Sequence, residues 1–237
     1  LWSRGLGDVY KRQVQNVAED QADLPKAALG SYKKEQDKLT DDLRRKCLQA
    51  YYASISFMDA QVGRVIDSLD RLGLANDTVI VFTSDHGYHT GEHGLWQKMS
   101  LFEESARVPM LIVSPEHSKA SVAPAPVAHV DLFPTLTELC GIQAPNNVHG
   151  QSLVPMLKNP SHLGRGWAIT QVQRGSGNAG RANRGDIGAD GEKFFGYSLR
   201  TPRWRYTEWD EGKKGRELYD HDACLLYTSD AADDTPC

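Results

Sequence analysis

The chain has 237 residues, of which 40% are hydrophobic and 24% charged, and its formal net charge at pH 7 is −4. This composition is typical of a globular domain, and the slight acidity gives no attraction to nucleic acid or to an anionic membrane. The sequence contains no apolar run that approaches the ~20 residues of a membrane-spanning helix. We therefore expect neither a nucleic-acid partner nor a membrane span.

Two terminal segments read as translated transposon-adapter DNA. The codons GAT GTG TAT AAG AGA CAG encode Asp-Val-Tyr-Lys-Arg-Gln, which stands at residues 8–13. The reverse complement of that DNA contains TGT CTC TTA TAC ACA TC, which encodes Cys-Leu-Leu-Tyr-Thr-Ser, the sequence at residues 224–229. Such additions are excluded from fold reasoning. We expect residues 1–13 and 224–237 to be adapter-derived, and the part between them to be a fragment cut at both ends.

The first predicted element is a long amphipathic helix. Thr40 or Asp41 can cap its start, and Gly73 can end it. Apolar side chains recur between these caps at steps of three and four residues, as one face of a helix requires. They are Leu48, Tyr51, Tyr52, Ile55, Met58, Val62, Val65, Ile66, Leu69 and Leu72.

Two apolar runs after this helix predict an α/β domain. Thr78–Thr83 reads as a strand buried on both faces, and Val108–Pro115 reads as a second one. A short helix is predicted for Met99–Ala106 and a longer one for His129–Ile142. This alternation indicates a mainly parallel sheet flanked by helices, which we assign to residues 14–160.

The character of the sequence changes after residue 160. Residues 175–191 are rich in glycine, but they lack the spacing of a phosphate-binding loop and are interpreted as a surface loop. Gly196–Trp209 reads as a hairpin, and Glu217–His221 can add a strand, which predicts a small antiparallel subdomain over residues 161–223. The hairpin carries three arginines that could reach an anionic sugar, although a solvated face is the favoured interpretation: Arg200, Arg203 and Arg205.

The segment Thr83–Lys98, TSDHGYHTGEHGLWQK, places metal-capable side chains directly after a predicted strand. Ligand sites in parallel α/β sheets lie beyond the carboxyl ends of the strands. Asp85 offers oxygens suited to Ca²⁺ or Mg²⁺, and His86 offers a nitrogen of the kind that zinc prefers. Lys98 offers a point charge for an anionic group. Together they indicate a mixed oxygen and nitrogen metal site beside an anion site.

Each of these residues has a simpler interpretation when it is taken alone. Asp85 and His86 can form a capped turn, and Lys98 can be an ordinary solvated lysine. His89 and His93 are better interpreted as structural residues than as ligands, because the H-x2-H-x3-H spacing matches no standard zinc site. Only the set as a whole favours a functional site.

The same segment resembles the metal-binding segment of the sulfatase family, in the alkaline-phosphatase-like superfamily, and is most similar to the iduronate-2-sulfatase-like branch. Further blocks resemble that family in the same order, and together they cover most of residues 49–221. They are ARVPMLIVSP, HVDLFPTL, GQSLVPML, SLRTPRWRYTEW and ELYDH. The resemblance implies an alkaline-phosphatase-like α/β fold with a small C-terminal antiparallel subdomain.

The resemblance also implies a chemistry. Asp85 and His86 would bind Ca²⁺, and Lys98 would bind the sulfate oxygens and stabilise charge as the ester breaks. His89 and His93 would be possible pocket residues. The nucleophile in this family is formylglycine, made from Cys or Ser in a C/S-x-P-S-R motif, and this chain has no such motif. We expect the nucleophile to lie upstream of this fragment, and the fragment alone to be inactive.

The implied substrate is a small-molecule or oligosaccharide sulfate ester. Two alternatives stay open: a hydrolase of phosphate mono- or diesters or phosphonates from the same superfamily, and a catalytically dead relative that keeps the metal site. The block GEHGLWQK favours the sulfatase, and the presence of Asp85, His86 and Lys98 argues against decay. Family habit implies a periplasmic or secreted protein. The oligomeric state is not predicted.

Overall fold

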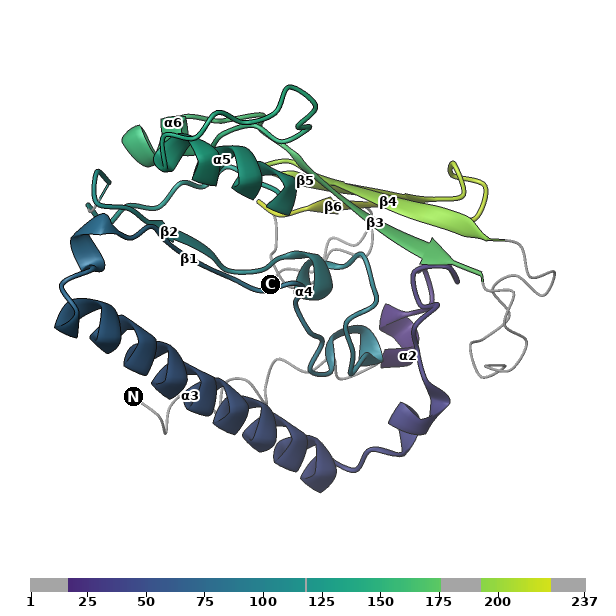
Figure 1. The fold of residues 1–237 in the computed structure, drawn as a ribbon. Coiled ribbons are helices and arrows are strands. Elements are labelled where there is room, and N and C mark those ends of the chain that lie inside the picture. The colour runs from purple at the N-terminus through teal and green to yellow at the C-terminus, as the bar shows by residue number, and fades with distance from the viewer. Residues whose placement is uncertain (1–16, 118, 176–192, 223–237) are drawn as a thin grey trace.

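The structure is a computed structural model that describes residues 17–117, 119–175 and 193–222 (Figure 1). The predicted adapter segments and nearly all of the glycine-rich segment lie outside these residues. The elements in chain order are α2 (Val17–Asp20), η1 (Lys34–Lys38), α3 (Asp41–Arg71), η2 (Ala75–Asp77), β1 (Ile80–Thr83), η3 (Glu92–Gly94), α4 (Glu103–Ala106), β2 (Met110–Val113), η4 (His129–Asp131), α5 (Leu132–Leu139), α6 (Val154–Lys158), β3 (Ala168–Arg174), β4 (Phe194–Arg200), β5 (Trp204–Trp209) and β6 (Arg216–Asp220).

The long helix α3 confirms the first predicted element. Its cap is Thr40, whose hydroxyl oxygen accepts a hydrogen bond from the Leu43 N–H at 3.3 Å. Gly73 follows the end of the helix with φ 69°, a conformation that glycine adopts without strain. Leu48 is the one buried residue of α3, and large apolar side chains such as Phe57 are mostly exposed. The predicted helix is therefore present, but α3 packs little of its apolar face against the described residues. Figure 1 shows α3 as a single long helix along one side of the molecule.

Strands β1 and β2 form an antiparallel pair, with Ile80 opposite Val113 and Thr83 opposite Met110. The prediction that these two strands run parallel, each buried on both faces, was wrong. After β1 the chain forms a loop over residues 84–98, the site loop, and then the one-turn helix α4. It enters β2 from the end at which it left β1, so β2 runs back along β1. The residues of β1 are half-buried, and β2 alternates between half-buried and exposed positions.

The C-terminal part is a four-stranded antiparallel sheet in the order β3-β4-β5-β6. The predicted hairpin is its β4-β5 pair, in which Arg200 lies opposite Arg205 beside the turn. Strand β6 is the predicted third strand, and β3 is a strand that the sequence did not reveal. In Figure 1 this sheet extends along one side of the molecule, with β1 and β2 lying between it and α3.

The main hydrophobic core lies between the inner face of this sheet and the site loop. Leu95, Leu101 and Phe102 from the loop region pack with Phe194 and Trp209 of the sheet. These side chains come from both predicted parts of the chain, so the two share one core, and the division at residue 160 stays a prediction. Among the described residues, no helix combines the length and the apolar character needed to cross a membrane.

Candidate metal and anion site

Asp85 and His86 lie in the loop directly after β1, where the sequence predicts them. Local hydrogen bonds fix the pair: Ser84 Oγ donates to the His86 carbonyl oxygen at 2.8 Å, and the His86 N–H donates to Asp85 Oδ1 at 3.0 Å. The Asp85 side chain is 85% exposed. The loop therefore presents an accessible carboxylate at the end of the strand.

Lys98 closes the site from the other end of the loop. Its ammonium donates to His86 Nε2 at 2.7 Å, and Asp85 Oδ2 lies 3.5 Å from the same nitrogen. The other ring nitrogen, Nδ1, lies 2.8 Å from the Gly87 carbonyl oxygen. Because a carbonyl oxygen can only accept, the assigned tautomer carries its proton on Nδ1 and directs the Nε2 lone pair at Lys98. The Asp85 carboxylate and the Lys98 ammonium thus both lie close to the Nε2 lone pair of His86.

Gly87 lets this loop lie directly against α4. Its N–H donates to the Ser105 carbonyl oxygen at 2.9 Å. A Cβ at this position would lie 1.9 Å from the Glu104 carbonyl oxygen, a distance that no side chain tolerates. The absence of a side chain is therefore required for the contact that holds the residue after His86.

His89 and His93, the two possible pocket residues, lie inside the loop and not in the wall of the cavity described below. His89 Nε2 lies 2.8 Å from Ser100 Oγ, and His93 Nδ1 lies 3.0 Å from Asp20 Oδ2. The His93 ring also stacks on Phe102 with centroids 4.2 Å apart. The structure thus brings Asp85, His86 and Lys98 together and places these two histidines in the packing beneath them.

Burial gives the two buried histidines opposite protonation behaviour. Removal from water lowers the pKa of His89 to about 3, and the positive charge of nearby His93 adds to this effect. For His93, burial alone would lower the pKa, but the hydrogen bond and charge of Asp20 override it, so the pKa is raised. Near neutral pH, His89 is therefore an uncharged hydrogen-bonding group within the packed loop.

A wide cavity of about 1600 Å³ opens beside the site, between β2 and the antiparallel sheet. Asp85, His86 and Lys98 line it together with an apolar wall. Residues of that wall include Val108, Met110, Ile112, Val127, Leu153 and Met156. A polar end and an apolar wall are the usual features of a small-molecule site.

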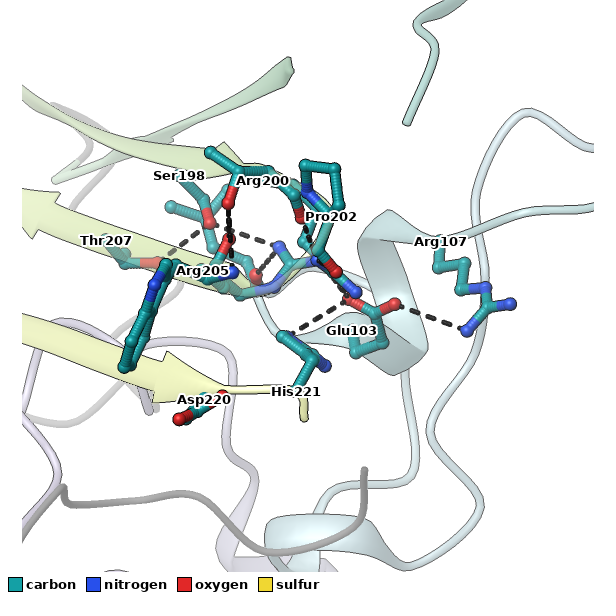
Figure 2. Close-up of polar contacts among 12 residues, drawn as sticks. Glu103, Arg107, Ser198, Arg200, Pro202, Arg205, Thr207, Asp220 and His221 are labelled. Carbon is teal, nitrogen blue, oxygen red and sulfur yellow. Dashed lines mark hydrogen bonds and ion pairs between the residues drawn. The ribbon is translucent and has the colours of Figure 1, made fainter. Parts of the chain in front are cut away.

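The three hairpin arginines have different surroundings. Arg203 is half exposed and pairs with Asp220 at 2.6 Å, which fits the favoured solvated face. Arg205 is buried and forms an ion pair with Glu103, and Arg200 Nε lies 3.4 Å from the same carboxylate (Figure 2). The solvated interpretation was therefore wrong for Arg205. The sequence did not single out Glu103, because its partners in the sheet are about a hundred residues away and only Arg107, 3.6 Å from Oε1, is a near neighbour in the chain.

The described residues supply only part of a metal shell. No group of three or more His, Cys, Asp or Glu side chains among them could hold a metal ion. Asp85 and His86 offer one oxygen donor group and one nitrogen, whereas Ca²⁺ takes six to eight ligands, mostly oxygens. The donor chemistry of this pair fits a share of a calcium site.

The family model described as sulfatase matches residues 11–142, more than half of the chain. The chain belongs to the sulfatase family. The human iduronate 2-sulfatase is 34% identical over 220 residues, which cover 71% of this chain and 38% of that protein. The choline-sulfatase of Rhizobium meliloti is 43% identical over 126 residues, which cover 50% of this chain and 24% of that protein. This sulfatase-family chain thus spans well under half the length of these curated relatives.

Solved structures confirm the expected alkaline-phosphatase-like fold of this sulfatase-family chain. The phosphonate monoester hydrolase of Agrobacterium radiobacter matches with a TM-score of 0.75 at 26% identity, over 94% of this chain and 47% of that one. A 2-O GAG sulfatase matches with a TM-score of 0.72 at 22% identity, over 94% of this chain and 48% of that one. The mixed α/β architecture with a C-terminal antiparallel sheet is therefore that of the family.

Proposed function

We propose that this chain is part of a sulfuric ester hydrolase in which Asp85 and His86 help to bind Ca²⁺ and Lys98 binds the sulfate group. The observation that carries this proposal is the 2.7 Å contact between Lys98 Nζ and His86 Nε2, beside the exposed Asp85 carboxylate. In a sulfatase-family chain, this arrangement places a metal-capable pair and a fixed cation at the same end of one cavity.

The proposed chemistry is electrostatic. Cleavage of the S–O bond of a sulfate ester builds negative charge on the leaving oxygen, and fixed positive charges near the sulfate oxygens and the leaving oxygen stabilise that change. Bound Ca²⁺ would supply a divalent charge that polarises the sulfate oxygens. The lone pair of His86 Nε2 can serve one electrophile at a time, so His86 as a metal ligand would leave the Lys98 ammonium free to bind the sulfate. The contact between the two residues thus describes a resting arrangement of the site.

The nucleophile is proposed to be a formylglycine that another part of the protein supplies. This chain contains no C/S-x-P-S-R motif from which the group could be made. A hydroxyl of the hydrated aldehyde would attack sulfur, the bond from sulfur to the ester oxygen would break, and the alcohol would leave with a proton as a covalent sulfate intermediate forms. We therefore propose that the chain alone does not hydrolyse sulfate esters.

The proposed substrate is a sulfated saccharide. Relatives that cover about 70% of this chain carry the name iduronate 2-sulfatase. The cavity, at about 1600 Å³, exceeds the ~300–1,000 Å³ of common small-molecule pockets and has room for more than one sugar ring. Hydrolysis of a phosphonate ester is the second candidate, and the likeness to a phosphonate monoester hydrolase at 26% identity supports it.

A chimera tests the proposal in an active enzyme. The matching segment of the Rhizobium meliloti choline-sulfatase is replaced by the corresponding segment of this chain, which is 43% identical over 126 residues. We expect the chimera to hydrolyse a sulfate ester with a kcat/KM at least about tenfold above that for the matching phosphonate ester. Lys98→Ala should lower the sulfate rate by about 100-fold or more, as removal of a transition-state cation does. A folded chimera that prefers the phosphonate ester would overturn the sulfatase assignment.

A further inference from the structure

Glu103 lies at the centre of a charge cluster that the proposed chemistry does not use. It is the first residue of α4, and its carboxylate meets basic side chains from the antiparallel sheet (Figure 2). Arg205 of β5 forms an ion pair with Oε2. Arg200 of β4 lies 3.4 Å and His221, just after β6, 3.9 Å from the same oxygen. One carboxylate thus pairs α4 with two strands of the sheet, β4 and β5, and lies near the residue that follows a third strand, β6.

The partner Arg205 is a fixed anchor because both terminal nitrogens of its guanidinium, Nη1 and Nη2, have hydrogen-bond partners. Its side chain is 4% exposed. Nη1 donates to the Leu101 carbonyl oxygen at 2.9 Å and to Ser198 Oγ at 3.1 Å, and Ser198 Oγ also accepts from Thr207 at 2.8 Å. A buried guanidinium needs an anion. Glu103 provides it, and although burial alone would raise the pKa of Glu103, the charge of Arg205 overrides this and lowers it.

The other side of α4 touches both arms of the site loop. On the His86 arm, the Gly87 N–H donates to the Ser105 carbonyl oxygen at 2.9 Å. On the Lys98 arm, Ser100 Oγ donates to Ser105 Oγ at 2.8 Å, and both hydroxyls are buried. The turn that carries Glu103 is therefore the common support of His86 and Lys98.

We propose that Glu103 is a positioning residue that fixes α4 against the antiparallel sheet and thereby sets the spacing between His86 and Lys98. The antiparallel sheet then supports the candidate site through α4, although none of the residues of the sheet belongs to the metal pair. The contacts from the sheet through Glu103 and α4 to the site loop do not depend on any function. Only the effect of Glu103 on hydrolysis rests on the proposed function. If Glu103 and Arg205 formed only an ordinary stabilising ion pair, removing it would lower the stability of the whole core and would not act on the loop in particular.

Amide hydrogen exchange of the full chain separates these two roles without any metal. We expect Glu103→Gln to speed exchange of the Gly87 amide by about tenfold or more, because its acceptor lies in the released α4 turn. Amides of the β4-β5 ladder should change by less than about twofold. Equal acceleration at both places would show a purely structural role and overturn the proposal, as would no change at Gly87.

Three further variants serve as controls for the exchange experiment. Glu103→Asp keeps the charge and should restore most of the Gly87 protection. Arg205→Lys keeps a buried cation with fewer donors and should give an intermediate effect, which covers the case in which Glu103→Gln does not fold. Glu211→Gln removes an exposed partner of Lys213, 3.1 Å away, and should leave Gly87 unchanged. If Glu103→Asp behaves as Glu103→Gln does, the charge is not what positions α4, and the proposal fails.

Failure of this inference can be told apart from failure of the proposed function. Ca²⁺ titration of the choline-sulfatase chimera reports on the metal pair, whereas exchange at Gly87 of the full chain reports on the Glu103 link. A folded chimera that binds no Ca²⁺, together with the expected exchange pattern, would reject the metal site and keep the positioning role. Ca²⁺ binding by the chimera, together with Gly87 exchange that Glu103→Gln leaves unchanged, would keep the metal site and reject the positioning role.

Discussion

The ammonium of Lys98 donates a hydrogen bond to Nε2 of His86, 12 residues earlier in the chain, at 2.7 Å. This contact uses the lone pair that a metal would need, and it holds the cation that would bind the substrate. In the proposed function, metal binding by His86 and anion binding by Lys98 would therefore be coupled through one nitrogen atom.

Asp85→Asn should weaken Ca²⁺ binding by about tenfold or more, because a neutral amide replaces the charged oxygen ligand. Isothermal titration calorimetry of the choline-sulfatase chimera measures the change, because the rest of that enzyme can complete the metal shell that the described residues of this chain supply only in part. Asp67→Asn on the exposed side of α3 is a matched control and should leave the affinity unchanged. Equal affinities of wild type and Asp85→Asn would remove Asp85 from the metal site.

Lys98→Met should leave Ca²⁺ affinity unchanged or raise it by a few-fold, because the ammonium no longer competes for His86 Nε2 or repels the cation. The same calorimetric titration gives the answer. The direction is informative, since most substitutions beside a metal site weaken binding. A large loss of affinity in Lys98→Met would show that the lysine supports the metal pair and does not compete with it.

His89 should make the protein less stable in acid. Its pKa is about 3 in the folded chain against a usual 6.5, so below pH 6.5 the unfolded state binds a proton that the folded state does not. Stability from this group is full above about pH 6.5 and falls by up to roughly 3–5 kcal/mol as the pH drops toward 3. His89→Gln keeps a hydrogen-bonding group for Ser100 and should flatten that fall. Urea unfolding between pH 4 and 7 tests it, and parallel curves for both proteins would contradict it.

Gly87→Ala should destabilise the fold by about 2 kcal/mol or more, because the added Cβ would overlap the Glu104 carbonyl oxygen. Gly63→Ala in the middle of α3 is the matched control. Nothing lies within 4 Å of a Cβ at Gly63, so alanine should stabilise the helix by about 0.5–1 kcal/mol. Thermal unfolding of both variants shows whether each substitution lowers or raises the stability of the fold. A neutral Gly87→Ala would mean that α4 does not press on the loop.

Features set by neighbouring residues were predictable from the sequence. The caps of α3 at Thr40 and Gly73 depend on local backbone preferences, and the helix ends close to both. The site loop was identified because its ligand types stand within one segment, which needs no tertiary information. The β4-β5 hairpin is likewise a contact between neighbours in the chain.

Features set by contacts between distant residues were not predictable. The direction of β2 depends on how the chain returns after α4, and a strand–helix–strand rhythm does not distinguish a crossover from a return at the same end. The pair of Glu103 with Arg205 spans 102 residues, so no spacing rule signals it. The burial of His89 depends on the core beneath the loop; the residues taken alone favoured a structural role for His89, and only the family resemblance suggested a place in the pocket.

The central claim is that Asp85, His86 and Lys98 form one working site, and nitrogen NMR of His86 during Ca²⁺ titration tests it most directly. We expect the Nε2 resonance to shift with Ca²⁺ as the metal takes the lone pair from Lys98, and we expect no shift in Asp85→Asn. The titration uses the folded choline-sulfatase chimera, because the described residues of this chain offer only part of a metal shell. A His86 resonance that stays unchanged at saturating Ca²⁺ in the chimera would contradict the account, because His86 would then be a partner of Lys98 alone.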